Sequence, residues 1–159
     1  MARGEFPHQT GSMNQPNPSL SASDAQLGVF IVEDSPVVRA RIEEMLAEIP
    51  GTFQAGHASA AEQAIRAIHD THPDIVLLDM HLENGTGLDV LRAVHPQLPE
   101  IAFYMVSSFT PPFYRRAALR LGATAYFDKT CQMAELRHTL ASLAGRSVQE
   151  HQVQLRQVQ

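Results

Sequence analysis

Five side chains in this sequence have the chemistry to bind a hard cation and a phosphoryl group, and each follows a short apolar run. Glu33 and Asp34 follow the first run, and Asp79 follows a later one. Ser107 ends another run, and Lys129, the only lysine of the chain, follows the last. Three carboxylates close together need a counter-charge, and Mg2+, which prefers oxygen ligands, can supply it. A phosphoryl group could then contact the metal, the ammonium and the hydroxyl, which are the electrostatic groups that phosphoryl transfer requires.

The elements that must position these side chains alternate between strands and helices from residue 28 to residue 145. Short apolar runs predict buried strands at 29–32, 53–58, 75–78, 101–106 and 124–127. The run Ile75–Leu78 is apolar on both faces, as is typical of parallel strands covered by helices on both sides. Strict alternation predicts an α/β fold with a parallel sheet and right-handed crossovers. Because ligands bind beyond the carboxyl ends of such strands, the five side chains should converge at one edge of the sheet.

Local signals predict where the helices begin. Ser35 is a candidate N-cap followed by a proline at the first helical position. The sequence from Ser59 to Glu62 matches a capping box for the second helix. Thr110 and the proline after it open the fourth helix, and Thr130 is a candidate N-cap for the last one.

Composition limits the class of protein. The 159 residues carry 12 Lys and Arg against 17 Asp and Glu, a formal net charge of −5, which argues against a nucleic-acid binder. No apolar run approaches the ~20 residues that span a bilayer, so we expect a cytoplasmic protein without membrane contact. Cys131 is the single cysteine, which excludes an intramolecular disulfide and a cysteine-based zinc site. We expect its thiol to be inert and partly buried.

The chain divides into three parts by sequence pattern. Residues 1–27 are rich in Pro, Gly, Ser, Asn and Gln and are expected to be a disordered leader. Within them, residues 1–12 resemble a leader added for expression. Residues 28–145 form one domain, and residues 146–159 are a Gln-rich tail that allows a short amphipathic helix or a flexible end.

Five short motifs follow one another along residues 28–145. They are Glu33-Asp34-Ser35-Pro36, Ile75-Val76-Leu77-Leu78-Asp79, Asn84-Gly85-Thr86-Gly87-Leu88, Met105-Val106-Ser107-Ser108 and Gly122-Ala123-Thr124-Ala125-Tyr126-Phe127-Asp128-Lys129. Taken in this order, the motifs resemble the receiver domain of two-component response regulators, and the resemblance covers residues 28–145. It implies a flavodoxin-like (βα)5 fold with a five-stranded parallel sheet in the order 2-1-3-4-5 and helices on both faces.

The resemblance also implies a phosphoacceptor and a metal site. Asp79 would accept a phosphoryl group from a sensor histidine kinase or a histidine phosphotransfer protein. Asp34 and Asp79 would bind Mg2+ directly, Glu33 would bind it through water, and the backbone carbonyl of His81 would complete the protein ligands.

Other positions match the residues that contact the phosphoryl group and respond to it. Ser107 matches the switch hydroxyl, with Ser108 beside it, and Lys129 matches the phosphate-binding lysine. Tyr126 matches the aromatic side chain that moves inward when Ser107 moves toward the phosphoryl group. These parts form a two-state element that one local change of charge can bias.

Some positions depart from the commonest pattern of the family. Glu83 stands where a proline often follows the phosphorylation loop, so we expect that loop to be more mobile. His81 and Phe109 occupy flanking positions that tune phosphoryl lifetime in the family, and a bulky Phe109 could shield the acyl phosphate from water. Thr130 stands where many members have a proline after a cis bond.

The leading hypothesis is a phosphorylation-dependent signalling switch with no separate metabolic substrate. A Mg2+-dependent phosphohydrolase that forms an aspartyl phosphate is a weaker alternative, because such enzymes usually carry a second Asp where this chain has His81. A phosphorylation-independent receiver scaffold is a further alternative, as is the receiver part of a longer DNA-binding response regulator. The family also suggests a homodimer through the last two helices and the last strand.

Overall fold

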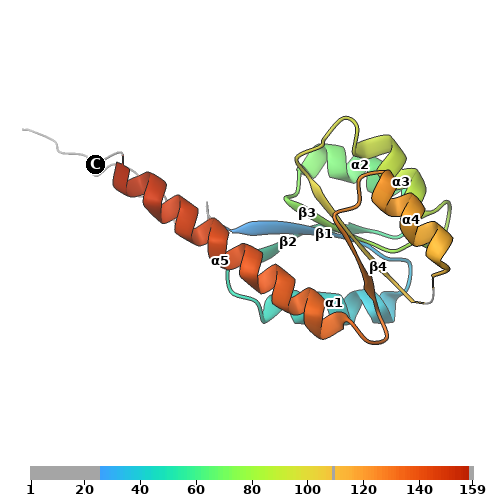
Figure 1. Ribbon diagram of the computed structural model, residues 1–159, viewed down its shortest axis with the longest axis horizontal. Helices are drawn as coiled ribbons and strands as arrows, with labels where there is room; N and C mark the ends of the chain where they lie inside the picture. Colours follow the sequence, from blue (N-terminus) through green and yellow to red (C-terminus); the bar gives the residue numbers. More distant parts are fainter. Residues whose placement is uncertain (1–25, 109, 158–159) are drawn as a thin grey trace, which may run out of the picture.

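The computed structural model describes residues 26–108 and 110–157, in which five strands alternate with five helices (Figure 1). The strands form one parallel sheet in the order β2-β1-β3-β4-β5, so the predicted fold and strand order are confirmed. In chain order the elements are β1 (Leu27–Val32), α1 (Pro36–Ala47), β2 (Thr52–Ala58), α2 (Ala61–Thr71), β3 (Ile75–Leu78), α3 (Gly87–Val94), β4 (Ala102–Ser107), α4 (Pro112–Arg120), β5 (Ala125–Asp128) and α5 (Met133–Gln157).

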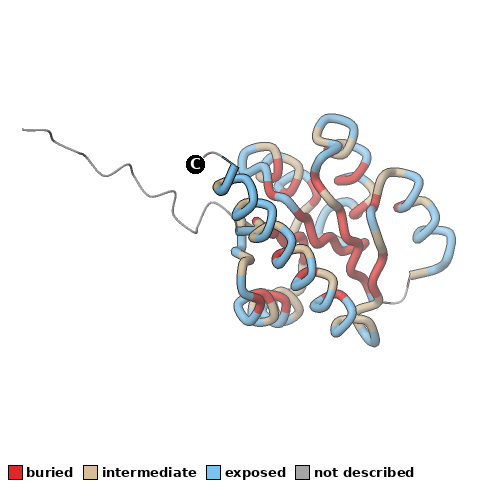
Figure 2. The backbone as a smooth tube through the Cα atoms, turned by 60° about the vertical axis from the view of Figure 1, so that its left-hand side comes forward, coloured by how far each residue is buried: buried red, intermediate tan, exposed pale blue. Residues whose placement is uncertain are grey.

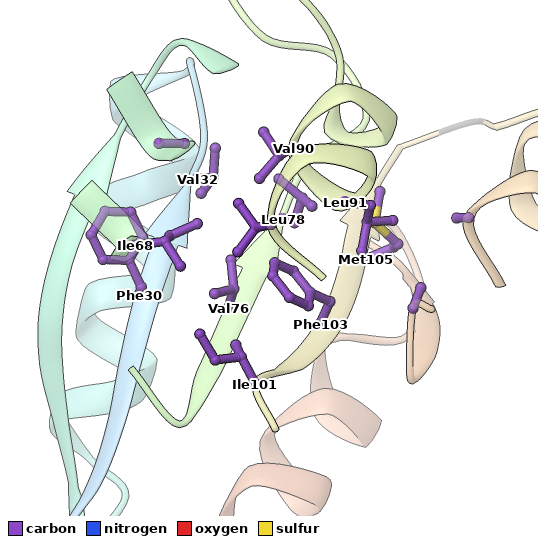
Figure 3. Packing of buried hydrophobic residues seen from close by; sticks show 14 of the residues in the cluster. Phe30, Val32, Ile68, Val76, Leu78, Val90, Leu91, Ile101, Phe103 and Met105 are labelled. Carbon is purple, nitrogen blue, oxygen red and sulfur yellow. The ribbon is translucent and has the colours of Figure 1, made fainter. Parts of the chain in front are cut away.

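The sheet is the buried middle layer of three, as the red central strands of Figure 2 show. Successive side chains of a strand point to opposite faces, so the strands divide their apolar residues between two cores. One core packs under α2, α3 and α4 and contains Phe30, Val76, Leu78 and Phe103 (Figure 3). The other packs under α1 and α5 and contains Val29, Ile31, Leu77 and Val106. Because both faces are covered, β3 is buried along its whole length, as its unbroken apolar run predicts.

The first helix begins as the sequence predicts, and the second does not. Ser35 is the N-cap of α1, and its hydroxyl accepts the N–H of Val38 at 3.4 Å. The predicted capping box at the start of α2 is wrong, because α2 begins at Ala61 with Ala60 at the N-cap and no side-chain cap. The N–H of Ala61 donates instead to the carbonyl of Asn84, which lies in the loop between β3 and α3, at 3.0 Å. The start of α2 is therefore tied to the loop that follows Asp79.

The last helix extends beyond the domain boundary that the sequence predicts at residue 145. α5 runs without interruption past residue 145 to Gln157 and extends away from the sheet (Figure 1). Residues 146–157 of the expected tail thus continue this helix. At the other end, Leu27 belongs to β1 and not to the expected leader, of which residues 1–25 lie outside the described residues. Among the described helices, none is both long and apolar enough to cross a membrane.

Candidate phosphoacceptor and metal site

Three carboxylates meet at the carboxyl edge of the sheet. Glu33 and Asp34 follow β1, and Asp79 follows β3, the strand that pairs with β1. Each can offer one carboxylate oxygen so that the three oxygens lie within 4.8 Å of one another. Glu33 and Asp79 are buried, with exposed fractions of 2% and 6%, and Asp34 is half-buried. This arrangement concentrates negative charge where little water can reach it.

Lys129 supplies the positive charge inside this cluster. Its Nζ lies 2.5 Å from Oε2 of Glu33 and 2.9 Å from Oδ2 of Asp79. Burial alone would lower the pKa of Lys129, but hydrogen bonds and charges from Glu33 and Asp79 outweigh it and raise that pKa. The pKa of Glu33 is raised, first by burial and also by the Asp79 charge, although Lys129 acts to lower it. The lysine therefore stays charged. The three carboxylates outnumber this one cation, so the site keeps an excess of negative charge.

The second oxygen of Asp79 is held by Ser107. The Ser107 hydroxyl, 1% exposed at the end of β4, donates to Oδ1 of Asp79 at 2.8 Å. Lys129 contacts Oδ2, so the two oxygens of one carboxylate have different partners. Asp79 is fixed from its backbone as well, because its N–H donates to the Val32 carbonyl at 2.9 Å.

A close approach of backbone at the start of α3 fixes the loop after Asp79. Gly87 lies against Asp79 so tightly that a Cβ at this position would stand 2.4 Å from the Asp79 carbonyl oxygen. The Gly87 N–H donates to the Met80 carbonyl at 2.9 Å, and His81 pairs with Thr86 in an antiparallel bridge. The bridge fixes the backbone of His81, whose carbonyl is a candidate metal ligand, while its side chain is exposed.

Glu83, at the tip of this loop, contacts the loop between β2 and α2. The Ser59 hydroxyl donates to Oε2 of Glu83 at 3.2 Å, and the Glu83 N–H donates to the Ser59 carbonyl at 3.2 Å. The sequence predicts a more mobile loop because a proline is absent here. In the structure, these two contacts with Ser59 hold the tip of the loop. Nothing in the sequence marks Ser59 as a partner of Glu83, because 24 residues separate the two.

The remaining predicted residues lie around the cluster. Ser108 follows Ser107 at the edge, and Tyr126 is buried beneath α4 with 8% of its surface exposed. Phe109 lies outside the described residues, so the prediction that it shields the phosphoryl group remains a prediction.

The segment after Lys129 shows the geometry of the Lys129–Thr130 bond and corrects two expectations, one about Thr130 and one about Cys131. The described residues contain no cis peptide bond, so the Lys129–Thr130 bond is trans. Thr130 is not an N-cap, because α5 begins three residues later at Met133 and the Thr130 hydroxyl and N–H donate to Asp128. These bonds lower the pKa of Asp128. The thiol of Cys131 is exposed, not partly buried as expected.

The donor set fits a hard divalent cation. Carboxylate oxygens and a backbone carbonyl are the ligands that Mg2+ prefers, and no histidine nitrogen or thiolate contributes to the cluster among the described residues. The pKa of Glu33 is raised first by burial and also by the charge of Asp79, so an added positive charge would stabilise its ionised form.

Known proteins identify the family. The sequence model of the response regulator receiver domain matches residues 29–141, and the chain belongs to this family. The DNA-binding transcriptional activator DevR/DosR of Mycobacterium tuberculosis is 28% identical over 121 residues, which cover 76% of this chain and 56% of that protein. Response regulator GacA of Pseudomonas viridiflava is 30% identical over 108 residues, which cover 68% of this chain and 50% of that protein. The chain thus spans about half the length of these curated relatives.

Solved structures agree on the fold. A LuxR-family two-component response regulator from Aurantimonas superposes with a TM-score of 0.69 at 22% identity, covering 80% of this chain and 99% of that chain. The response regulator domain of Thermotoga maritima CheB gives a TM-score of 0.66 at 21% identity, covering 78% of this chain and 97% of that chain. At this identity the likeness shows the shared fold.

Proposed function

We propose that this receiver domain is a phosphorylation-dependent switch whose phosphoacceptor is Asp79. The observation that carries the proposal is the environment of that carboxylate. One of its oxygens accepts a hydrogen bond from Ser107 and the other pairs with Lys129, beside two further carboxylates. A carboxylate that is buried, oriented at both oxygens and next to a lysine is prepared to act as a nucleophile toward phosphorus.

The reaction proposed is transfer from a phosphohistidine. A carboxylate oxygen of Asp79 forms a bond to phosphorus as the bond between phosphorus and the imidazole nitrogen breaks, and the imidazole leaves with the electron pair. The Lys129 ammonium and the Ser107 hydroxyl lie where they can donate to the oxygens of the transferred group. Asp34, Asp79 and the His81 carbonyl would hold Mg2+, with Glu33 binding through water, and the ion would neutralise the charge of the phosphoryl oxygens.

The donor is proposed to be a sensor histidine kinase or a histidine phosphotransfer protein. A groove of about 700 Å3 lies beside Lys129 between α1 and α5. Its apolar lining includes Val38 and Met45, and Arg41 and Arg137 also line it. Such a surface suits a partner that brings apolar and acidic side chains together with the phosphohistidine.

The test is phosphorylation by acetyl phosphate with Mg2+, followed by intact-mass spectrometry. We expect one added phosphoryl group on the parent and none on Asp79→Asn. The matched control is Asp70→Asn, an exposed aspartate on α2, which should behave as the parent. A parent that stays unmodified would refute the proposal and favour the phosphorylation-independent scaffold. An Asp79→Asn variant that gains the group would refute the assignment of Asp79 and place the phosphoacceptor at another residue.

Homodimerisation on phosphorylation is proposed through α4, β5 and α5. The exposed apolar side chains of α4 support this proposal, since Phe113 and Leu119 are 66% and 46% exposed. Clustered apolar side chains at a surface often mark a contact with a partner. Sedimentation of the phosphorylated protein tests this. Phe113→Ala should keep it monomeric, whereas Phe53→Ala, which removes an exposed phenylalanine at the opposite edge of the sheet, should not.

A further inference from the structure

Two loops from distant parts of the chain are joined at the carboxyl edge of the sheet. The Glu83 N–H donates to the Ser59 carbonyl at 3.2 Å, and the Ser59 hydroxyl donates to Oε2 of Glu83 at 3.2 Å. The Ala61 N–H donates to the Asn84 carbonyl at 3.0 Å. Together these hydrogen bonds form a tie between the β2–α2 loop and the β3–α3 loop.

The β2–α2 loop is held firmly enough to act as a support. Ala58, which ends β2, is fully buried, and its carbonyl accepts the N–H of Glu33 at 3.0 Å. At the next residue, the Ser59 N–H donates to the side chain of Gln63 in the first turn of α2 at 3.3 Å. The support is therefore fixed at one end to a residue of the acidic cluster and at the other end to α2.

The β3–α3 loop that the tie holds carries a candidate metal ligand, the backbone carbonyl of His81. The Leu82 side chain packs against the core under α2 and α3. At the tip, Gly85 has a φ of +91° and lies so close to Ala61 that a Cβ at Gly85 would stand 2.8 Å from the Ala61 Cβ. The position of the His81 carbonyl thus depends on contacts that are made two to four residues further along the loop.

The exposure of the tip makes the tie matter for affinity. Glu83 and Asn84 are exposed, so water can replace their hydrogen bonds when the loop opens. One such bond typically shifts the equilibrium between a closed and an open loop by about two- to tenfold. If the open loop misplaces the His81 carbonyl, a metal ion binds only the closed fraction, and its apparent affinity falls with that fraction.

We propose that Ser59 and Glu83 are positioning residues, which hold the His81 carbonyl in place for Mg2+ by closing the β3–α3 loop onto the start of α2. The tie restricts the loop at the position where a proline is common in the family. Because linkage is reciprocal, Mg2+ bound at the acidic cluster should strengthen the tie, so the start of α2 should respond to the metal. This inference rests on the metal site of the proposed function.

The test is a double-mutant cycle read by the affinity for Mg2+ in isothermal titration calorimetry. The parent, Ser59→Ala, Glu83→Ala and the double variant would be compared at one fixed ionic strength, because Glu83 is an exposed charge. We expect each single substitution to weaken binding about two- to fivefold. The double variant should bind no more weakly than Glu83→Ala, because both substitutions remove the same hydrogen bond.

Conservative variants separate the hydrogen bond from the charge of Glu83. Glu83→Gln removes the charge and keeps an acceptor for the Ser59 hydroxyl, and Ser59→Thr keeps the hydroxyl. Both should bind Mg2+ within about twofold of the parent. Ser142→Ala on α5 and Glu100→Ala before β4, two exposed positions outside the tie, should bind as the parent does.

Hydrogen exchange at the Ala61 amide, followed by NMR, reads the tie directly. In the parent, this exchange should slow in proportion to the Mg2+ concentration above the dissociation constant, because the metal binds the closed loop. In Ser59→Ala without metal, it should be faster than in the parent by about the factor that the affinity loses.

The outcomes distinguish this inference from the proposed function. If the parent binds Mg2+ and both alanine variants bind it equally tightly, the tie is only structural and the inference is overturned, whatever the exchange rate of Ala61. Additive losses in the double variant would also overturn it, since they would not arise from the shared bond. If the parent binds no Mg2+, the metal site of the proposed function fails, and this inference fails with it.

Discussion

Replacing Lys129 with methionine removes the one positive charge inside a buried acidic cluster. The lysine is 12% exposed at its side chain and pairs with Glu33 at 2.5 Å and Asp79 at 2.9 Å. Breaking a buried ion pair typically costs about 3–5 kcal/mol, because the remaining charge loses its partner. The substitution leaves two carboxylates, Glu33 and Asp79, without this partner. Because the lysine is partly exposed, we expect the lower end of the range, a loss of about 3 kcal/mol in the free energy of unfolding at pH 7. A typical domain has a free energy of unfolding of about 5–15 kcal/mol, so this loss is readily measured.

Urea unfolding in EDTA at pH 5 to 8 measures both this loss and its pH dependence. The pKa of Glu33 is already raised by burial, and removing Lys129 removes an interaction that lowers it. The folded variant then binds a proton at Glu33 more tightly than its unfolded chain does, so its stability rises as the pH falls from 8 to 5. The raised pKa of Lys129 means that its stabilisation of the parent is complete throughout this window and is lost only at alkaline pH, above about 10.4.

Arg137→Met is the matched control for that substitution. Arg137 pairs with Glu48 at 2.5 Å, but the two side chains are 47% and 62% exposed, so the pair should contribute less than about 1 kcal/mol. The reasoning is refuted if the two variants lose the same free energy, or if the deficit of Lys129→Met does not shrink toward pH 5.

Four further substitutions test local packing and capping by thermal or urea unfolding. Gly87→Ala should destabilise the domain and slow phosphorylation, because its Cβ would stand 2.4 Å from the Asp79 carbonyl oxygen, whereas Gly145→Ala, with nothing within 4 Å, should stabilise α5 by about 0.5–1 kcal/mol. The opposite order of these two variants would contradict the assigned contacts. Phe103→Ala should cost about 3–5 kcal/mol, since Phe103 is fully buried, and a loss below about 1 kcal/mol would argue against that core. Thr86→Ala should cost about 1 kcal/mol by removing the capping box of α3, and an unchanged midpoint would count against the cap.

The sequence predicted the strands and the edge at which the site forms because both depend on local patterns. An unbroken apolar run such as Ile75–Leu78 has no polar face to expose, so it must lie inside a covered parallel sheet. Once the strands are parallel, Asp79, Ser107 and Lys129 must lie at the same edge, where Ser107 and Lys129 contact the Asp79 carboxylate.

Contacts between distant segments could not be predicted in the same way. The direct pair between Glu33 and Lys129 depends on side-chain conformations that spacing alone does not determine. The bond between Tyr126 and Thr110 joins residues 16 positions apart, and it depends on how the segment before α4 lies over β5. The capping box at Ser59 failed by a single residue, since the N–H of Ser59 is instead satisfied by the side chain of Gln63.

The projecting part of α5 makes the helix a lever. Ala144 is its last fully buried residue, and from there to Gln157 the helix is about 20 Å long at 1.5 Å per residue (Figure 1). A tilt of about 10° at the buried base would move the tip by roughly 3–4 Å, because the displacement of a rigid rod grows with its length. The buried residues Leu136, Leu140 and Ala144 anchor the first half of α5 to the sheet, so a change in the angle of the helix is largest at its projecting end.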